Sequence, residues 1–152
     1  MIVIAHRGNT TGPNEEHENN PDYLLTAIRS GYHVETDIWL IDDTFYLGHD
    51  GPQYKVSVQF LDLISPKSVF HCKNIPALHT LLKEYPSYHC FFHNEDACTL
   101  TSLRHIWTYP GQQLTSSSIC VMPERVGATY EEVLKTNCIG VCTDYPGLFL
   151  NR

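Results

Sequence analysis

The chain has 152 residues, a hydrophobic content of 42% and a formal net charge of −7. A chain of this length can bury a substantial core, so we expect residues 1–152 to form one domain. The sequence contains only ten Lys and Arg residues. This argues against a nucleic-acid-binding protein, because phosphate backbones need clustered positive charge. One phosphate group held by an Arg and a Lys remains compatible with this composition.

No apolar stretch reaches the length of a signal core or of a membrane span, so we expect a cytoplasmic protein without a membrane span. The chain has six cysteines. In apolar strand-like runs, reduced cysteine behaves as a small hydrophobe, and four of the six lie in such runs: Cys72, Cys90, Cys120 and Cys142. We therefore expect free thiols in a reducing compartment. The sequence has no C-x-x-C pair, which argues against a structural zinc site.

Short strands alternate with short helices along the chain. Helices are predicted after Asn20, Ser57, Asn74 and Thr129, because each of these residues can cap an apolar helical stripe. A single helical turn is predicted over Thr99 to Ser102. The predicted strands are the apolar runs at 2–5, 33–41, 44–47, 68–73, 88–93, 105–109, 118–122 and 138–143.

This alternation indicates parallel βαβ units. The expected fold is therefore α/β, a compact or incomplete (β/α)8 TIM-type barrel with shortened outer helices. The chain is shorter than the roughly 200 residues or more of an ordinary barrel of this type, so an open barrel is one alternative. A homodimer would then cover the bare flank.

Glu35 and Asp37 lie two residues apart, on one face of the strand predicted at 33–41. Two neighbouring carboxylates repel each other unless a positive charge lies between them or they point to solvent. One interpretation is an exposed edge strand with scattered charge. The apolar neighbours Val34 and Ile38 indicate a buried strand, which favours a divalent cation such as Mg²⁺ or Ca²⁺.

His6 and His49 each follow a predicted strand and lie near a glycine, Gly8 or Gly48. Imidazole titrates near pH 6.5, so a pair of histidines can serve as the base and the acid of one reaction. The alternative is that each is a hydrogen-bonded packing residue. The position of the pair at strand ends beside a predicted metal site favours the catalytic interpretation.

Arg7 and Lys73 also stand at predicted strand ends. A guanidinium and an ammonium beside a catalytic histidine suit an anionic substrate, so both are candidate phosphate ligands. The alternative for Arg7 is an ion pair with a carboxylate of the following loop, such as Glu15 or Glu18.

Further polar and aromatic residues are candidates for a substrate pocket. His93 follows a predicted strand and would add a ligand or a substrate contact, or else belong to a polar loop that caps a helix. Trp107, Tyr109 and Glu124 stand at predicted strand ends and would form an aromatic wall with one carboxylate, suited to a sugar or polyol. Trp107 suits the core equally well. Glu18 is a further candidate for the pocket.

Four segments together resemble a known family. They are His6-Arg7-Gly8, Glu18-Asn19-Asn20, Glu35-Thr36-Asp37 and Gly48-His49-Asp50. Their order and spacing resemble the N-terminal signature of glycerophosphodiester phosphodiesterases, which has H-R-G, P-E-N-T, E-x-D and H-D motifs. Thr143-Asp144-Tyr145-Pro146 is similar to the T-D-x-P motif near the C-terminus of that family.

The resemblance implies a TIM-barrel, metal-dependent phosphodiesterase that acts on a small phosphodiester. By this resemblance, His6 and His49 are the general acid and base, and Glu35 and Asp37 hold the metal. The positions of Arg7 and Lys73 match residues that lie near the phosphate.

The chain also departs from the pattern of this family. His71 stands where the family has a third acidic ligand, and imidazole would extend the metal preference toward Mn²⁺ or Zn²⁺. The family's insertion after H-D, which helps to bind the glycerol side of the substrate, is reduced to about residues 51–56, and this argues against ordinary glycerophosphodiester specificity. Two alternatives therefore remain: a non-catalytic phosphate- or sugar-phosphate-binding protein, and a lyase that releases a cyclic phosphate.

Overall fold

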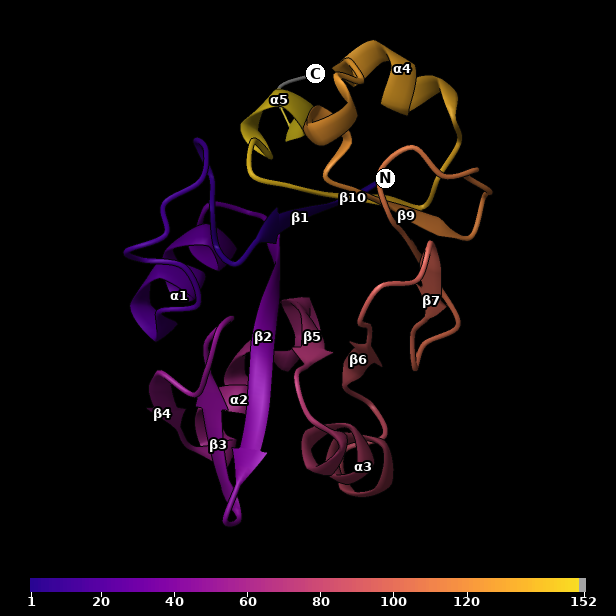
Figure 1. The fold of residues 1–152 in the computed structure, drawn as a ribbon. Coiled ribbons are helices and arrows are strands. Elements are labelled where there is room, and N and C mark those ends of the chain that lie inside the picture. The colour runs from indigo at the N-terminus through magenta and orange to yellow at the C-terminus, as the bar shows by residue number, and fades with distance from the viewer. Residues whose placement is uncertain (151–152) are drawn as a thin grey trace.

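The structure is a computed structural model that describes residues 1–150 (Figure 1). Its strands are β1 (Ile2–His6), β2 (His33–Ile41), β3 (Thr44–Leu47), β4 (Tyr54–Val56), β5 (Ser68–Cys72), β6 (His89–Phe92), β7 (Cys98–Leu100), β8 (Ile106–Thr108), β9 (Ser118–Val121) and β10 (Gly140–Thr143). Its helices are α1 (Pro21–Arg29), α2 (Val58–Ile64), α3 (Ile75–Glu84), α4 (Tyr130–Lys135) and α5 (Gly147–Leu150), with 3₁₀ turns η1 (Ser65–Lys67) and η2 (Pro123–Val126).

The strands form one curled, mixed sheet that resembles half of a barrel (Figure 1). Its parallel wall runs in the order β8-β9-β10-β1-β2-β5-β6. The first part of β2 lies between β1 and β5, whereas its last part, Ile38 to Ile41, pairs with β3 in antiparallel register. β4 and β7 extend the sheet by further antiparallel pairs.

The predicted compact or incomplete (β/α)8 TIM-type barrel is therefore wrong. Helices connect only some of the parallel strands: α1 follows β1, α2 and α3 flank β5, and α4 precedes β10. Within the described residues, segment 93–117 forms β7, β8 and irregular turns. This segment is rich in Thr and Ser, is interrupted by Pro110-Gly111 and lacks a helical apolar stripe, so it cannot supply the missing outer helices.

The helical turn predicted over Thr99 to Ser102 is wrong for the same reason, since Cys98–Leu100 is strand β7. The four predicted helices are confirmed. Asn20, Ser57 and Asn74 each accept hydrogen bonds from backbone N–H groups of the helix that follows. Thr129 and Glu132 form a reciprocal capping box at α4. These caps satisfy N–H groups that a helix leaves without internal partners.

The two faces of the curled sheet carry different side chains. On its convex face, Val34, Ile38 and Phe70 pack with residues of α1, α2 and α3. On its concave face, residues of strands far apart in the sheet pack together, among them Ile4 of β1 and Trp107 of β8. Alternate residues of a strand point to opposite faces, so β1 and β2 also turn His6, Glu35 and Asp37 to the concave face.

The curl brings β6 close to the turn that follows β7. The Ser102 N–H donates to the Cys90 carbonyl at 2.8 Å, and the Thr99 hydroxyl donates to the Phe92 carbonyl at 3.1 Å. These bonds tie the two ends of the wall together where a closed barrel would have a further strand pairing. The predicted homodimer is not tested by this arrangement and stays a prediction.

The sequence predicts free thiols. All six cysteines are free thiols, and Cys98 is the exposed one.

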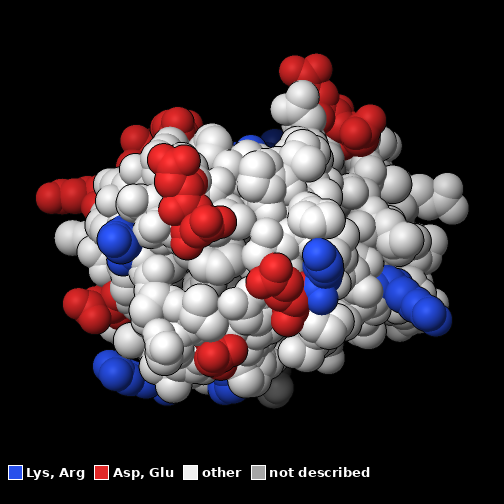
Figure 2. Space-filling model, turned by 90° about the horizontal axis from the view of Figure 1, so that it is seen from below, with Lys and Arg blue, Asp and Glu red and all other residues white. Residues whose placement is uncertain are grey.

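Among the described residues, no helix is long and apolar enough to cross a membrane. On the face seen in Figure 2, acidic side chains are scattered, and the Lys and Arg side chains stand apart from one another.

Candidate active site

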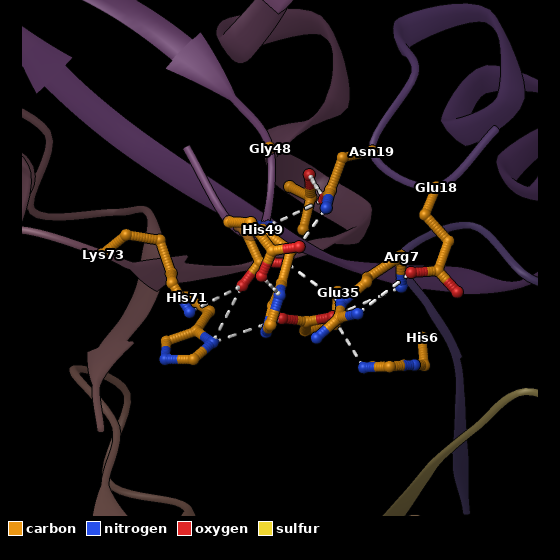
Figure 3. A network of polar contacts seen from close by, with 12 residues as sticks. His6, Arg7, Glu18, Asn19, Glu35, Gly48, His49, His71 and Lys73 are labelled. Carbon is orange, nitrogen blue, oxygen red and sulfur yellow. Dashed lines mark hydrogen bonds and ion pairs between the residues drawn. The ribbon is translucent and has the colours of Figure 1, made fainter. Parts of the chain in front are cut away.

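The candidate active site lies at the carboxyl ends of the parallel strands, where sheets of this kind place their sites. β1 ends at His6 and Arg7, the middle of β2 carries Glu35 and Asp37, and β5 carries His71. Figure 3 shows the side chains of His6, Arg7, Glu35 and His71 lying close together, although they come from separate parts of the chain.

Asp37 is the most highly connected member of this group. Its carboxylate is fully buried, and it accepts a hydrogen bond from Asn19 Nδ2 at 3.0 Å. Three cationic or imidazole nitrogens surround it: Arg7 Nε at 3.0 Å, His71 Nδ1 at 3.1 Å and Lys73 Nζ at 3.5 Å. Burial alone would raise the pKa of Asp37, but contact with His71 and the charges of Arg7 and Lys73 lower it well below its usual range.

Glu35 lies beside Asp37 and is almost fully buried. Its Oε2 accepts the Arg7 backbone N–H at 3.3 Å and lies 4.0 Å from His6 Nε2. Its Oε1 lies 3.7 Å from His71 Nδ1. Burial and the neighbouring Asp37 charge raise the pKa of Glu35. The two carboxylates therefore have opposite pKa shifts, as expected where two acids share limited positive charge.

Glu35, Asp37 and His71 fit a divalent cation. Their ligand atoms all lie within 4.8 Å of one another. The distances from His71 Nδ1 to Asp37 Oδ1 and Glu35 Oε1, 3.1 and 3.7 Å, are within the roughly 4.2 Å that opposite ligands of one Mg²⁺ ion span. Asp37 Oδ1 is buried and accepts no hydrogen bond from the described residues. Its charge is met by the ion pairs with His71 and Lys73 at 3.1 and 3.5 Å, and a cation at this point would use its remaining lone pairs. Two carboxylates and an imidazole suit Mg²⁺, Mn²⁺ or Zn²⁺.

His6 is oriented by a residue from the opposite end of the chain. Its Nδ1–H donates to Asp144 Oδ1 at 2.8 Å, and Asn9 Nδ2 donates to the same oxygen at 2.8 Å. The other ring nitrogen, Nε2, is left facing Glu35. Burial lowers the pKa of His6, but the Asp144 hydrogen bond and the Glu35 charge outweigh it, and the pKa is raised. Asp144 thus stabilises the imidazolium form.

Arg7 connects the loop after β1 to the carboxylates. Its backbone has a φ of 51°, in the left-handed region that non-glycine residues rarely adopt. Its NH1 donates to Glu18 Oε2 at 2.9 Å, so the alternative of an ion pair with a loop carboxylate is confirmed for Glu18. Arg7 also lines two clefts of the site. The Arg7 guanidinium therefore makes ion pairs with Glu18 and Asp37 and also borders the clefts.

His49 approaches the site on the turn after β3. It is partly exposed, and its Nδ1–H donates to Asp50 at 2.7 Å. The turn is fixed at Gly48, whose N–H donates to the Asp37 carbonyl at 3.1 Å and whose carbonyl accepts the Trp39 indole N–H at 2.6 Å. His6 and His49 line the same two clefts. The structure thus brings together the histidines that the sequence predicts as a pair.

The two clefts have volumes of about 780 and 290 Å³. The larger one extends from His6 over Glu18 and Glu124. The smaller one lies over Glu35 and His71 and is bounded by His93 and Trp107. All four residues predicted for a substrate pocket, Glu18, His93, Trp107 and Glu124, therefore line one cleft or the other.

Three of these four residues make contacts within the protein that occupy much of their polar or aromatic surface. His93 stacks on Tyr109 with ring centroids 3.7 Å apart, and its Nε2–H donates to the Asp96 carbonyl. Trp107 is 2% exposed and stacks on Phe91, so core packing accounts for most of its surface. Glu124 Oε1 accepts hydrogen bonds from the Thr143 hydroxyl and the Asp144 N–H, both at 2.9 Å.

Sequence reasoning left three buried residues, Asn9, Asn19 and Asp144, out of the site. Asn19 has a φ of 62° and fixes β2 through its contacts with Thr36 and Asp37. A signal was present for Asp144, which directly follows a strand and belongs to the segment similar to T-D-x-P. Asn9 carried no such signal.

Comparisons of the chain with protein-family models, with curated proteins and with solved structures give no match. What the site does must therefore be inferred from its own chemistry.

Proposed function

We propose that this protein is a metal-dependent hydrolase of small phosphodiesters of the glycerophosphodiester type. The main support for the proposal is that His6 and His49 line one cleft together with Glu35 and His71, two of the three possible metal ligands. A protein that only bound an anion would not need an acid and a base beside metal ligands. The four segments that resemble glycerophosphodiester phosphodiesterases support the same activity.

Glu35, Asp37 and His71 are the residues that would hold the ion. A divalent cation bound there would polarise the phosphoryl oxygens and lower the pKa of an attacking hydroxyl group. Arg7 and Lys73 hold the Asp37 carboxylate in place and add positive charge on the side of the site where negative charge builds on the phosphate.

His6 and His49 would transfer the protons. One imidazole takes the proton of the attacking hydroxyl while the other gives a proton to the leaving oxygen. Asp144 holds His6 in the tautomer that directs Nε2 toward Glu35. The attacking hydroxyl belongs to water in a hydrolase and to a neighbouring alcohol of the substrate in a lyase.

The proposal is tested by assaying the purified chain on a 4-nitrophenyl phosphodiester with Mg²⁺ or Mn²⁺. Turnover is expected only with metal present. The His6→Ala and His49→Ala variants should each lose about 10²- to 10⁴-fold in rate, with circular dichroism showing that each remains folded. His79, exposed on α3, provides a His79→Ala control that should retain full activity.

Phosphorus NMR of the products separates the alternatives. Accumulation of a cyclic phosphate from a substrate with a neighbouring hydroxyl would identify a lyase. Binding of inorganic phosphate without turnover of any diester would identify a binding protein and overturn the proposed hydrolase.

A further inference from the structure

The two cations predicted as phosphate ligands are already paired with carboxylates. Arg7 contacts Glu18 and Asp37, and Lys73 contacts Asp37. Around the site the carboxylates outnumber these cations: Glu18, Glu35, Asp37, Glu124 and Asp144. A divalent cation held by Glu35, Asp37 and His71 would supply part of the positive charge that a phosphodiester anion needs. Any further positive charge must come from a side chain that these carboxylates do not already neutralise.

Arg125 supplies such a charge. Five residues line both clefts: His6, Arg7, His49, Met122 and Arg125. Among residues 1–150 the Arg125 side chain makes no ion pair or hydrogen bond. Burial raises the pKa of Asp144, but contacts with His6 and Asn9 and the charge of Arg125 lower it. The guanidinium thus acts electrostatically on the acid that orients His6.

A strained turn places Arg125 at this point. Met122 is 3% exposed, packs in the concave core and has a φ of 46° and a ψ of 53°. A left-handed conformation is unusual for methionine and persists only where the surroundings impose it. The Met122 N–H donates to the Cys142 carbonyl at 2.7 Å, and the Arg125 N–H donates to the Met122 carbonyl at 3.0 Å.

This turn separates two neighbouring side chains. Glu124 is held inward by Thr143 and the Asp144 N–H, whereas Arg125 is exposed and borders the clefts. A planar guanidinium matches two phosphate oxygens with parallel hydrogen bonds. The junction of the clefts, beside both histidines, is where a bound phosphodiester would place these oxygens if its two alcohol groups occupied one cleft each.

We infer that Arg125 is the substrate-recognition residue of this site, which binds the phosphate of the diester at the junction of the two clefts. Arg7 and Lys73 serve mainly to hold the carboxylates. This role of Arg125 rests on the proposed phosphodiesterase function for its substrate class, but it makes a separate claim about phosphate binding.

Calorimetric titration with inorganic phosphate tests this role without requiring turnover. The Arg125→Ala variant should bind phosphate about 10- to 100-fold more weakly than the wild type, as expected for the loss of charge-assisted hydrogen bonds. Arg125→Lys, which retains the charge but not the planar fork, should recover part of the affinity. Arg29→Ala, at the exposed end of α1, should bind like the wild type.

The outcomes separate this inference from the proposed function. Phosphate binding that depends on Arg125 in a protein that turns over no diester would support Arg125 and overturn the hydrolase. Equal phosphate affinity of the wild type and Arg125→Ala would overturn the role of Arg125 even if the enzyme is active. No measurable phosphate binding by the wild type would also overturn it. In an active enzyme, Arg125→Ala should raise KM for the diester more than it lowers kcat.

Discussion

His6 Nδ1 lies 2.8 Å from Asp144 Oδ1, although 138 residues separate them in sequence. The pairing of β1 with β10 makes this contact, because Ala5 and Thr143 are register partners and the next residue of each strand follows at the same edge. A carboxylate on Nδ1 fixes the tautomer of the imidazole and leaves Nε2 for proton transfer. The first and last parallel strands of the chain thus build one half of the candidate acid–base pair.

Asp144→Asn should leave the fold intact and lower the rate of diester cleavage by about 10²- to 10⁴-fold, because an amide in this position can favour the wrong tautomer of His6. The pH–rate profile should also shift, since the raised pKa of His6 depends on this hydrogen bond. Asp43→Asn, in the exposed turn between β2 and β3, is the matched control. An unchanged rate and profile for Asp144→Asn would remove Asp144 from the mechanism.

Gly48 fixes the turn that carries His49. Its φ is 146°, and a Cβ added there would lie 2.2 Å from the Gly51 carbonyl oxygen. Gly48→Ala should therefore displace the turn and lower the rate toward that of His49→Ala. Gly51→Ala is a matched control in the same turn, since an added Cβ there meets no atom within 4 Å. Steady-state kinetics of the two variants should differ sharply, and equal rates would show that the position of His49 is unimportant.

Divalent metal should raise the melting temperature if Glu35, Asp37 and His71 bind it. At one hundred times Kd the gain in unfolding free energy is about 2.7 kcal/mol, which corresponds to roughly 5–10 °C for a domain of this size. His71→Ala should lose most of this shift in differential scanning fluorimetry with Mn²⁺, whereas His79→Ala should keep it. The same shift in both variants would place the bound ion elsewhere.

Asp37 should matter for folding as well as for the metal. Replacing it by Asn leaves Arg7 and Lys73 partly buried without their shared carboxylate, and breaking a buried ion pair from one side costs about 3–5 kcal/mol. Urea denaturation of Asp37→Asn should show a loss of this order. Asp62→Asn, on the exposed side of α2, should lose less, although its carboxylate accepts a bond from Tyr88.

His89 should make the protein less stable in acid. Burial and the nearby His105 and His33 lower the pKa of His89 from 6.5 to about 4. Between these values the unfolded chain binds a proton that the folded protein does not, so stability falls as the pH drops from about 6.5 to 4 and is unaffected by this group above that window. The full effect is roughly 3 kcal/mol.

Urea denaturation at pH 7 and pH 4.5 checks this expectation. His89→Gln should lose less stability than the wild type over this interval, while exposed His79→Gln should behave like the wild type. An equal loss in His89→Gln and the wild type would assign the acid sensitivity to other groups.

Local signals in the sequence predicted much of the fold. Asn20, Asn74 and Thr129 act through backbone groups within one turn of their own positions, so the helices they cap could be located from sequence. The fold class could not be predicted. β7 and β4 are three residues each, and their existence depends on partners β8 and β3 rather than on their own pattern. Without helices in segment 93–117, a barrel prediction based on alternation fails.

Some residues of the candidate site could be predicted from the sequence, and others could not. Glu35 and Asp37 could be found because the strand period puts them on one face of one strand, and His71 because it stands where the family that the chain resembles has a third acidic ligand. The pairing of Arg7 with Glu18 was open, because it depends on left-handed residues that fold the loop back on β1. Arg125 was missed because its place depends on the kink at Met122, which no apolar pattern encodes.

β2 serves two parts of the molecule at once. Val34 and Ile38 anchor the convex core, while the alternate residues Glu35 and Asp37 belong to the cluster of possible metal ligands with His71. A slip of one residue against β1 or β5 would exchange these roles and bury bare acids among the helices. A mutation that changes the register of β2 therefore damages both the folded core and the candidate site. The position of the two acids in the sheet is thus tied to the stability of the fold.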